Sequence, residues 1–97
     1  MIYNIDVTKE GDLLTGKDRG YLFADENVIK SYLPTSIKIL YTGSQMITSS
    51  FFYGVLKWLE ETFEFEGLGA YSFKRIISLV NVDDLITEEF NRALDRL

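Results

Sequence analysis

The sequence predicts a single α/β domain of β-α-β-α-β-α order, in which a small, largely parallel sheet packs against helices. Strand-like and helix-like segments alternate along the chain, and the connections are long enough for the right-handed crossovers that parallel strands require. A length of 97 residues supports one modest core and leaves no room for a second. We therefore assign residues 1–97 to one domain.

The first element is expected to be a strand over residues 1–7. Polar and apolar side chains alternate there, with Tyr3, Ile5 and Val7 on one face. A period of two is typical of a half-exposed strand, so we expect this strand at the edge of the sheet.

A helix is expected to follow, ending at Pro34. Polar loop residues precede it, and Thr15 or Asp18 can act as its N-cap; a cap at Asp18 would start the helix near Arg19. Apolar residues recur at spacings of three and four over 21–33, which gives one buried stripe. Proline ends the helix because it cannot continue the hydrogen-bond ladder.

Two further segments have the composition of strands in a sheet covered by helices. Residues 37–41 are mostly apolar and rich in β-branched side chains, and Gly43 is expected to end this strand. Residues 73–80 carry apolar side chains on both faces, and Asn81 ends the run. We expect the first segment inside the sheet and the second covered on both faces.

The clearest helical pattern lies over residues 52–63. Apolar side chains recur there at i, i+3, i+4, i+7 and i+11, with charged residues on the opposite side. The last helix is expected to begin at Asp83 and Asp84, because negative charge is favoured at a helix N-terminus. Its apolar face runs from Ile86 to Leu97.

The composition argues against several classes of function. The chain has no His and no Cys, so it lacks the side chains of hydrolase triads, disulfide frameworks and the commonest zinc sites. A net charge of -5, with Lys and Arg scattered along the chain, disfavours nucleic-acid binding. The apolar stretches are too short to span a bilayer, and the N-terminus does not resemble a signal peptide. We therefore expect a cytoplasmic protein that is not an enzyme, holds no cofactor or metal and binds no membrane.

Candidate functional residues gather where the second helix begins. Thr48, Ser49 and Ser50 follow a strand-like segment, and ligands of parallel sheets collect where strands end and helices start. Two compatible interpretations remain open. The hydroxyl groups cap the helix, or Ser49 or Ser50 accepts a phosphate that would meet the free N–H groups of the first turn.

The second helix also carries candidates for a protein-binding surface. Phe51 and Trp58 are seven residues apart and therefore on one helical face, where they are either exposed interface anchors or covered by neighbouring loops. Glu60, Glu61 and Glu64 gather carboxylates near the C-terminal end of the helix. They form either a solvated face or an acidic patch for a basic partner.

These segments together resemble the STAS-like domains of uncharacterised function found in bacteria and phages. The resemblance covers residues 17–97 and rests on residues 39–41, 46–51 and 73–81 with the helices that follow. The chain is more distantly similar to the anti-anti-sigma STAS domains, whose Asp-Ser-Ser-Gly turn carries a serine that a partner kinase phosphorylates. Here Thr48 replaces the aspartate and Phe51 the glycine.

The resemblance implies a non-enzymatic regulatory module that docks a partner protein through the start of the second helix and is switched by serine phosphorylation. By the same analogy, the partner is a histidine-kinase-type ATPase or a sigma-factor regulator. A competing hypothesis is a small acidic inhibitor, phage-encoded, whose glutamates block a nucleic-acid-binding enzyme. A third is a small-ligand or nucleotide sensor at the strand ends. An edge strand and exposed aromatic residues are also compatible with a homodimer.

Overall fold

The computed structural model confirms the predicted α/β class and the alternation of strands and helices. It describes residues 2–6, 11–27, 36–41, 45–63, 75–80 and 83–97. Its elements are β1 (Ile2–Asp6), β2 (Leu13–Leu14), α1 (Lys17–Asn27), β3 (Ser36–Leu40), β4 (Met46–Ile47), α2 (Ser49–Phe63), β5 (Ile77–Val80) and α4 (Asp84–Asp95). The predicted ends at Pro34, Gly43 and Asn81 lie outside the described residues.

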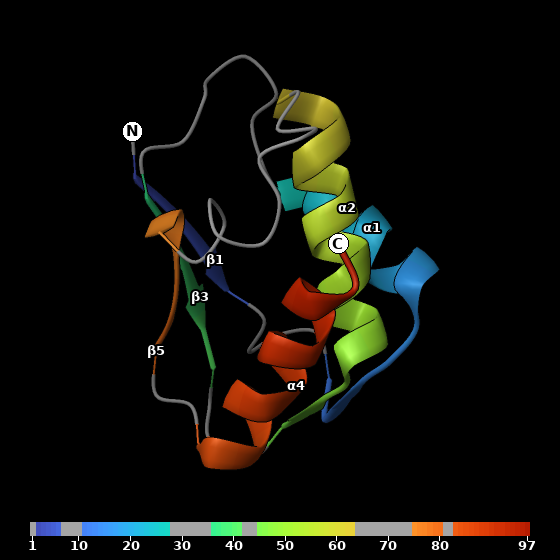
Figure 1. Ribbon diagram of the computed structural model, residues 1–97, viewed down its shortest axis with the longest axis vertical. Coiled ribbons are helices and arrows are strands. Elements are labelled where there is room, and N and C mark those ends of the chain that lie inside the picture. Colours follow the sequence, from blue (N-terminus) through green and yellow to red (C-terminus); the bar gives the residue numbers. More distant parts are fainter. Residues whose placement is uncertain (1, 7–10, 28–35, 42–44, 64–74, 81–82) are drawn as a thin grey trace.

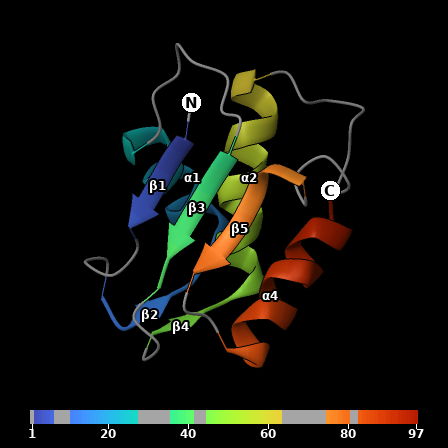
Figure 2. The same cartoon turned by 90° about the vertical axis from the view of Figure 1, so that its left-hand side faces the viewer.

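The main sheet is parallel and has the order β1-β3-β5 (Figure 2). Its register pairs Ile39 of β3 with Ile5 on one side and with Leu79 on the other. Among the described strands β3 is therefore central and β1 lies at the edge. Both placements agree with the prediction.

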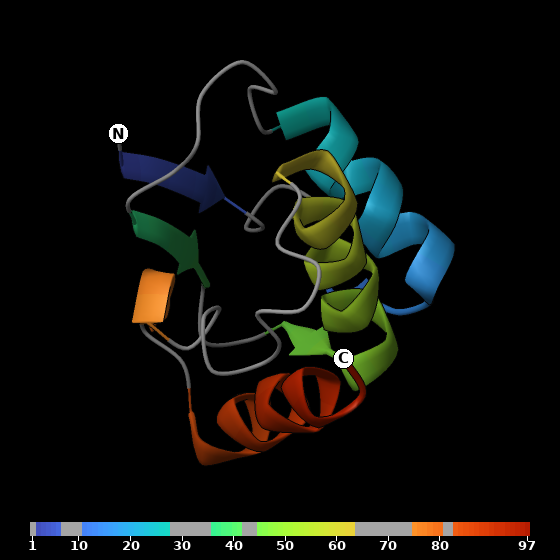
Figure 3. The same ribbon diagram turned by 45° about the horizontal axis from the view of Figure 1, so that its top comes forward.

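The helices cover one face of this sheet, and no helix of the described ranges lies over the other face (Figures 2 and 3). β3 alternates accordingly, with Ile37 and Ile39 buried and Lys38 exposed. In β5, Ile77 is buried and Ser78 is exposed. The expectation that both faces of the last strand are covered is wrong for its described part, because all the described helices lie on one side of the sheet.

Helix α2 occupies the middle of the molecule. It lies between the sheet and α1, and α4 packs beside it (Figures 1 and 3). Its predicted apolar stripe faces the core, where Phe52, Val55, Leu56 and Leu59 are buried and Phe63 is partly buried. The ring of Phe52 meets that of Phe90 in α4 edge to face, with centroids 5.2 Å apart.

A second, two-stranded ribbon was not expected from the sequence. β2 and β4 run parallel and pair Leu13 with Met46 and Leu14 with Ile47. Leu14 and Ile47 are buried, whereas Leu13 and Met46 point to solvent. The ribbon lies beyond the carboxyl ends of the main strands, next to the N-terminal end of α4 (Figure 2).

The start of α1 differs from the prediction. The helix begins at Lys17, so Asp18 lies within its first turn, and neither Thr15 nor Asp18 is the N-cap. Gly16 precedes the first helical residue, and its carbonyl accepts a hydrogen bond from the Gly20 N–H at 3.1 Å. Gly16 has a φ of +89°, which a residue with a side chain adopts only under strain.

The start of α4 agrees with the prediction. Asp83 is the N-cap, and its Oδ1 accepts a hydrogen bond of 2.9 Å from the backbone N–H of Ile86. The buried side chains of the helix include Ile86, Phe90 and Leu94, as the apolar pattern predicts. Within the described residues no helix is both long and apolar enough to cross a membrane.

Helices α1 and α2 touch backbone to backbone at two glycines. A Cβ atom on Gly20 would lie 2.0 Å from the carbonyl oxygen of Phe51, and one on Gly54 would lie 2.0 Å from that of Lys17. Both distances are far inside van der Waals contact, and a backbone carbonyl cannot rotate away as a side chain does. Only glycine permits this approach.

We expect Gly20→Ala and Gly54→Ala each to lower the free energy of unfolding by about 3 kcal/mol, because each methyl group forces the two helices apart. Urea unfolding followed by the fluorescence of Trp58 measures this. The sign is decisive for Gly54→Ala, since helix propensity alone would raise stability by about 1 kcal/mol.

Gly16→Ala is the matched control. Nothing lies within 4 Å of a Cβ atom at this position, so only the strain of the positive φ remains, about 1 kcal/mol. A Gly54→Ala protein as stable as wild type, or more stable, would contradict the close helix contact.

Candidate functional site at the carboxyl edge

The ends of the strands and the starts of two helices meet on one side of the molecule. We call this surface the carboxyl edge and define it by Leu13 and Met46 of the ribbon, residues 48–50 at the start of α2, and residues 83–85 at the start of α4. β4 leads directly into α2, and α4 packs against β4. Figure 1 shows the ribbon and the starts of both helices at the same end of the molecule.

Thr48 stands at the N-cap position of α2. Its Oγ1 accepts a long hydrogen bond of 3.4 Å from the Phe51 N–H, and its carbonyl accepts one of 3.2 Å from Phe52. The N–H of Thr48 donates to the Leu14 carbonyl at 3.0 Å, which fixes the cap to the ribbon. Ser49 and Ser50 are the first two residues of the helix, and all three hydroxyl-bearing residues are half-buried.

A carboxylate from α4 already occupies the N-terminus of α2. The backbone N–H of Ser49 donates to Oε1 of Glu89 at 3.2 Å. The other carboxylate oxygen of Glu89 accepts a bond of 2.8 Å from Arg92. A helix N-terminus favours negative charge through its free N–H groups and its dipole. Glu89 supplies that charge from within the chain and ties α4 to the start of α2.

Three exposed apolar side chains lie on the carboxyl edge. Among the described residues the large apolar side chains that are exposed are Leu13, Leu22, Met46 and Leu85, with exposed fractions of 57%, 54%, 40% and 50%. Leu13 and Met46 are neighbours across the ribbon, so they form one continuous patch. The exposed carboxylates near these residues in the chain are Asp12, Asp83, Asp84 and Glu88.

Of the two alternatives for Phe51 and Trp58, exposure is wrong and coverage is right. Each is only 1% exposed, so neither is a surface anchor. Phe51 packs against Phe23 of α1, with ring centroids 5.7 Å apart. The indole N–H of Trp58 donates to Oδ1 of Asp25 in α1 at 2.9 Å. The prediction considered only loops as a cover for this face of α2, whereas α1 covers it.

The glutamates at the C-terminal end of α2 have partners within the chain. Glu60 forms an ion pair with Lys57 at 2.8 Å, and Oε2 of Glu61 accepts a hydrogen bond of 2.6 Å from the Tyr21 hydroxyl. Glu64 lies outside the described residues. The described part of the predicted acidic patch is therefore partly neutralised by its own neighbours.

Among the described residues, three side chains have shifted pKa values. The hydrogen bond to Glu61 raises the pKa of Tyr21, burial raises the pKa of Tyr41, and the hydrogen bond to Glu60 raises the pKa of Lys57. Each shift favours the protonated form, which the group already has at neutral pH. None of the three is therefore tuned to exchange a proton near pH 7. In the described part of the chain, no group of three or more acidic side chains is placed to hold a metal ion.

Comparison of the chain with protein-family models, curated proteins and solved structures found no match. The resemblance to STAS-like domains therefore stays a prediction from short sequence motifs.

Sequence reasoning missed Leu13, Met46 and Glu89 as members of this surface. A strand of two residues is too short to show a period, so neither half of the ribbon gave a signal. The contact from Glu89 joins residues 40 positions apart, which no local pattern reports. A Glu three residues before an Arg on the last helix was the one visible sign of a side chain held in place.

We expect Thr48→Ala to lower the free energy of unfolding by about 1 kcal/mol, because it removes the side-chain acceptor for the first turn of α2. Thr48→Ser keeps that acceptor and should recover most of the loss. Chemical unfolding of both variants measures the difference, with Ser50→Ala as the control. Equal losses for Thr48→Ala and Ser50→Ala would mean that Thr48 has no special capping role.

Glu61→Gln should move the pKa of Tyr21 back toward its ordinary value near 10, because a neutral amide accepts the tyrosine hydrogen bond more weakly than the carboxylate does and also removes its negative charge. In the wild type the raised pKa implies a stabilisation that is present below pH 10 and is lost as pH rises through the pKa of the folded protein. Tyrosine ring-carbon chemical shifts followed by NMR between pH 8 and 12 measure both values. Glu88→Gln removes a distant carboxylate and should leave Tyr21 unchanged.

Proposed function

We propose that this protein is a non-enzymatic regulatory module of the cytoplasm that docks a partner protein at its carboxyl edge, around the start of α2. The observation that supports it is the exposed pair Leu13 and Met46, which sits directly beside the first turn of that helix. Single exposed apolar residues are common on protein surfaces. A continuous pair on an edge ribbon, with Leu85 exposed on the helix that packs against it, is the arrangement of an interaction surface.

Charge suggests the chemistry of the partner. Exposed carboxylates flank the apolar residues, with Asp12 next to Leu13 and Asp84 next to Leu85. The chain as a whole carries a net charge of -5. A partner with an apolar centre and a basic rim complements this surface, whereas a second copy of the chain would bring like charges together. We therefore propose a basic protein partner rather than a homodimer at this edge.

Serine phosphorylation would act on the same surface. A phosphate on Ser49 would compete with the Glu89 carboxylate for the Ser49 N–H at the start of α2, and it would add negative charge beside the Glu89–Arg92 ion pair. Phosphorylation would thus loosen the link between α4 and α2 rather than fill an empty anion site. The analogy with STAS domains names a histidine-kinase-type ATPase or a sigma-factor regulator as the partner.

The competing hypothesis, an acidic inhibitor of a nucleic-acid-binding enzyme, relied on the glutamates of α2. Glu60 is paired with Lys57 and Glu64 lies outside the described residues, so the described part of α2 shows no continuous acidic patch made of the three glutamates.

A photo-crosslinking amino acid placed at Leu13 or Met46 in living cells should capture the partner, and the same residue placed at Lys38 or Ser78 should not. Lys38 and Ser78 are both exposed and lie on the face of the main sheet that no described helix covers. The captured protein is then identified by mass spectrometry and purified. Its affinity should fall about tenfold or more for Leu13→Ser with Met46→Ser, since the apolar centre of an interface carries most of the binding energy.

Asp84→Lys should weaken the same complex and reduce its dependence on salt, because it removes one attraction to the basic rim. The proposal fails if the crosslinks from positions 13 and 46 match those from the control positions, or if the double variant binds the captured protein as tightly as wild type does.

A further inference from the structure

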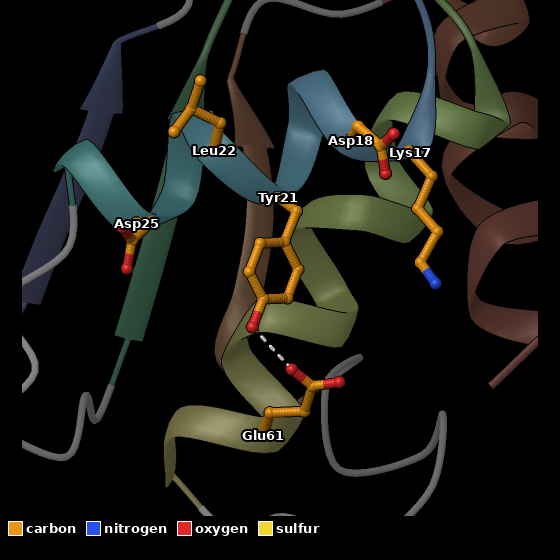
Figure 4. A pocket seen from close by; sticks show the side chains of 6 residues that line it. All are labelled: Lys17, Asp18, Tyr21, Leu22, Asp25 and Glu61. Carbon is orange, nitrogen blue, oxygen red and sulfur yellow. Dashed lines mark hydrogen bonds between the residues drawn. The ribbon is translucent and has the colours of Figure 1, made fainter.

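A hollow of about 530 Å³ lies along α1, beside the C-terminal end of α2. Five of its lining residues come from α1 and one from the last turns of α2. They are Lys17, Asp18, Tyr21, Leu22, Asp25 and Glu61. We call this hollow the α1 pocket; Figure 4 shows its side chains. Glu61 lies twelve residues along α2 from Ser49, about 18 Å at the helical rise, so the Glu61 end of the pocket is separate from the start of α2.

Two carboxylates of the pocket are held in place by hydrogen bonds. The Tyr21 hydroxyl donates to Oε2 of Glu61 at 2.6 Å, and the other oxygen of Glu61 points away from Tyr21 (Figure 4). The Trp58 indole donates to Oδ1 of Asp25 at 2.9 Å. Side chains fixed in this way lose little further conformational freedom when a ligand binds, which favours binding.

The remaining walls suit a flat cation on an apolar stem. The ring of Tyr21 stands between Lys17 and Asp25, and Leu22 adds an aliphatic surface that is 54% exposed. Three carboxylates against one ammonium group give the pocket a net negative charge. A guanidinium group stacks on an aromatic ring, donates two parallel hydrogen bonds to a carboxylate and is more weakly hydrated than an ammonium group.

The pocket is open. All of its lining residues except Tyr21 are exposed, whereas sites for free small molecules bury most of the ligand surface. An exposed hollow of this kind suits one side chain presented by a larger molecule, because the rest of that molecule covers the opening.

We infer that the α1 pocket is a second protein-binding site, which receives an arginine side chain of a basic partner against Tyr21 and between the carboxylates of Asp25 and Glu61. This site is independent of docking at the carboxyl edge. It does not require the exposed leucine and methionine of the ribbon, and either surface can exist without the other.

The probe is the peptide acetyl-Ala-Arg-Ala-amide, added to isotope-labelled protein in a two-dimensional NMR titration. The expected result is a set of amide shift changes confined to residues 17–25 and 58–61, with weak affinity that falls as salt is added. The matched peptide carries citrulline in place of arginine. Citrulline has the same shape without the charge, and it should bind detectably more weakly.

Two variants test the pocket directly. Asp18→Asn removes a lining carboxylate that has no hydrogen bond or ion pair to another described residue, and Glu61→Gln keeps the acceptor for Tyr21 but removes the charge. Each should weaken the arginine peptide by about two- to fivefold, the usual worth of one exposed charge pair. Glu88→Gln, the same change on α4, should have no effect.

Circular dichroism and the thermal midpoint of each variant are measured first, so that a folding defect is recognised, and Asp18→Asn serves alone if Glu61→Gln is unstable. Three results overturn the inference: no shift changes at the pocket, equal binding of the arginine and citrulline peptides, or equal weakening by Glu88→Gln. Failure of the crosslinking experiment at positions 13 and 46 leaves this titration unaffected, so the two proposals fail separately.

Discussion

The contact between the backbones of α1 and α2 is the constraint on which the rest of the structure depends. Gly20 and Gly54 let the two helices approach until a carbonyl oxygen of one helix lies 2.0 Å from the position that a Cβ atom on the glycine of the other would take. As a result, α1 covers the face of α2 that is turned away from the sheet. Phe51 and Trp58 become core residues for this reason, since α1 supplies the ring of Phe23 and the carboxylate of Asp25 as their partners.

The two ends of α2 contact different elements of the fold. At its start, Glu89 of α4 accepts a hydrogen bond from the Ser49 N–H, and the cap at Thr48 is anchored to the ribbon. Toward its end, the Tyr21 hydroxyl of α1 donates a hydrogen bond to Glu61, and Asp25 of α1 accepts one from the Trp58 indole. One central helix thus links a surface built with α4 and the ribbon to another built with α1.

Local patterns predicted the elements but not how they cover one another. The stripe from Phe52 to Leu59, the central place of β3 and the cap at Asp83 all follow from neighbours in the sequence, where spacing and composition act directly. Whether an aromatic residue on α2 faces solvent depends instead on where α1 lies. That position is set by two glycines 34 residues apart, neither of which breaks or caps a helix.

The face of the main sheet that no described helix covers has a practical use. Lys38 and Ser78 are partners in the parallel register and both are exposed, on the side of the sheet turned away from α1 and α2. The chain contains no cysteine, so a single thiol introduced by Ser78→Cys would be the only one available for coupling. A dye or solid support attached there would lie on the sheet face turned away from the helices, and it would leave the ribbon and α1 accessible to solvent.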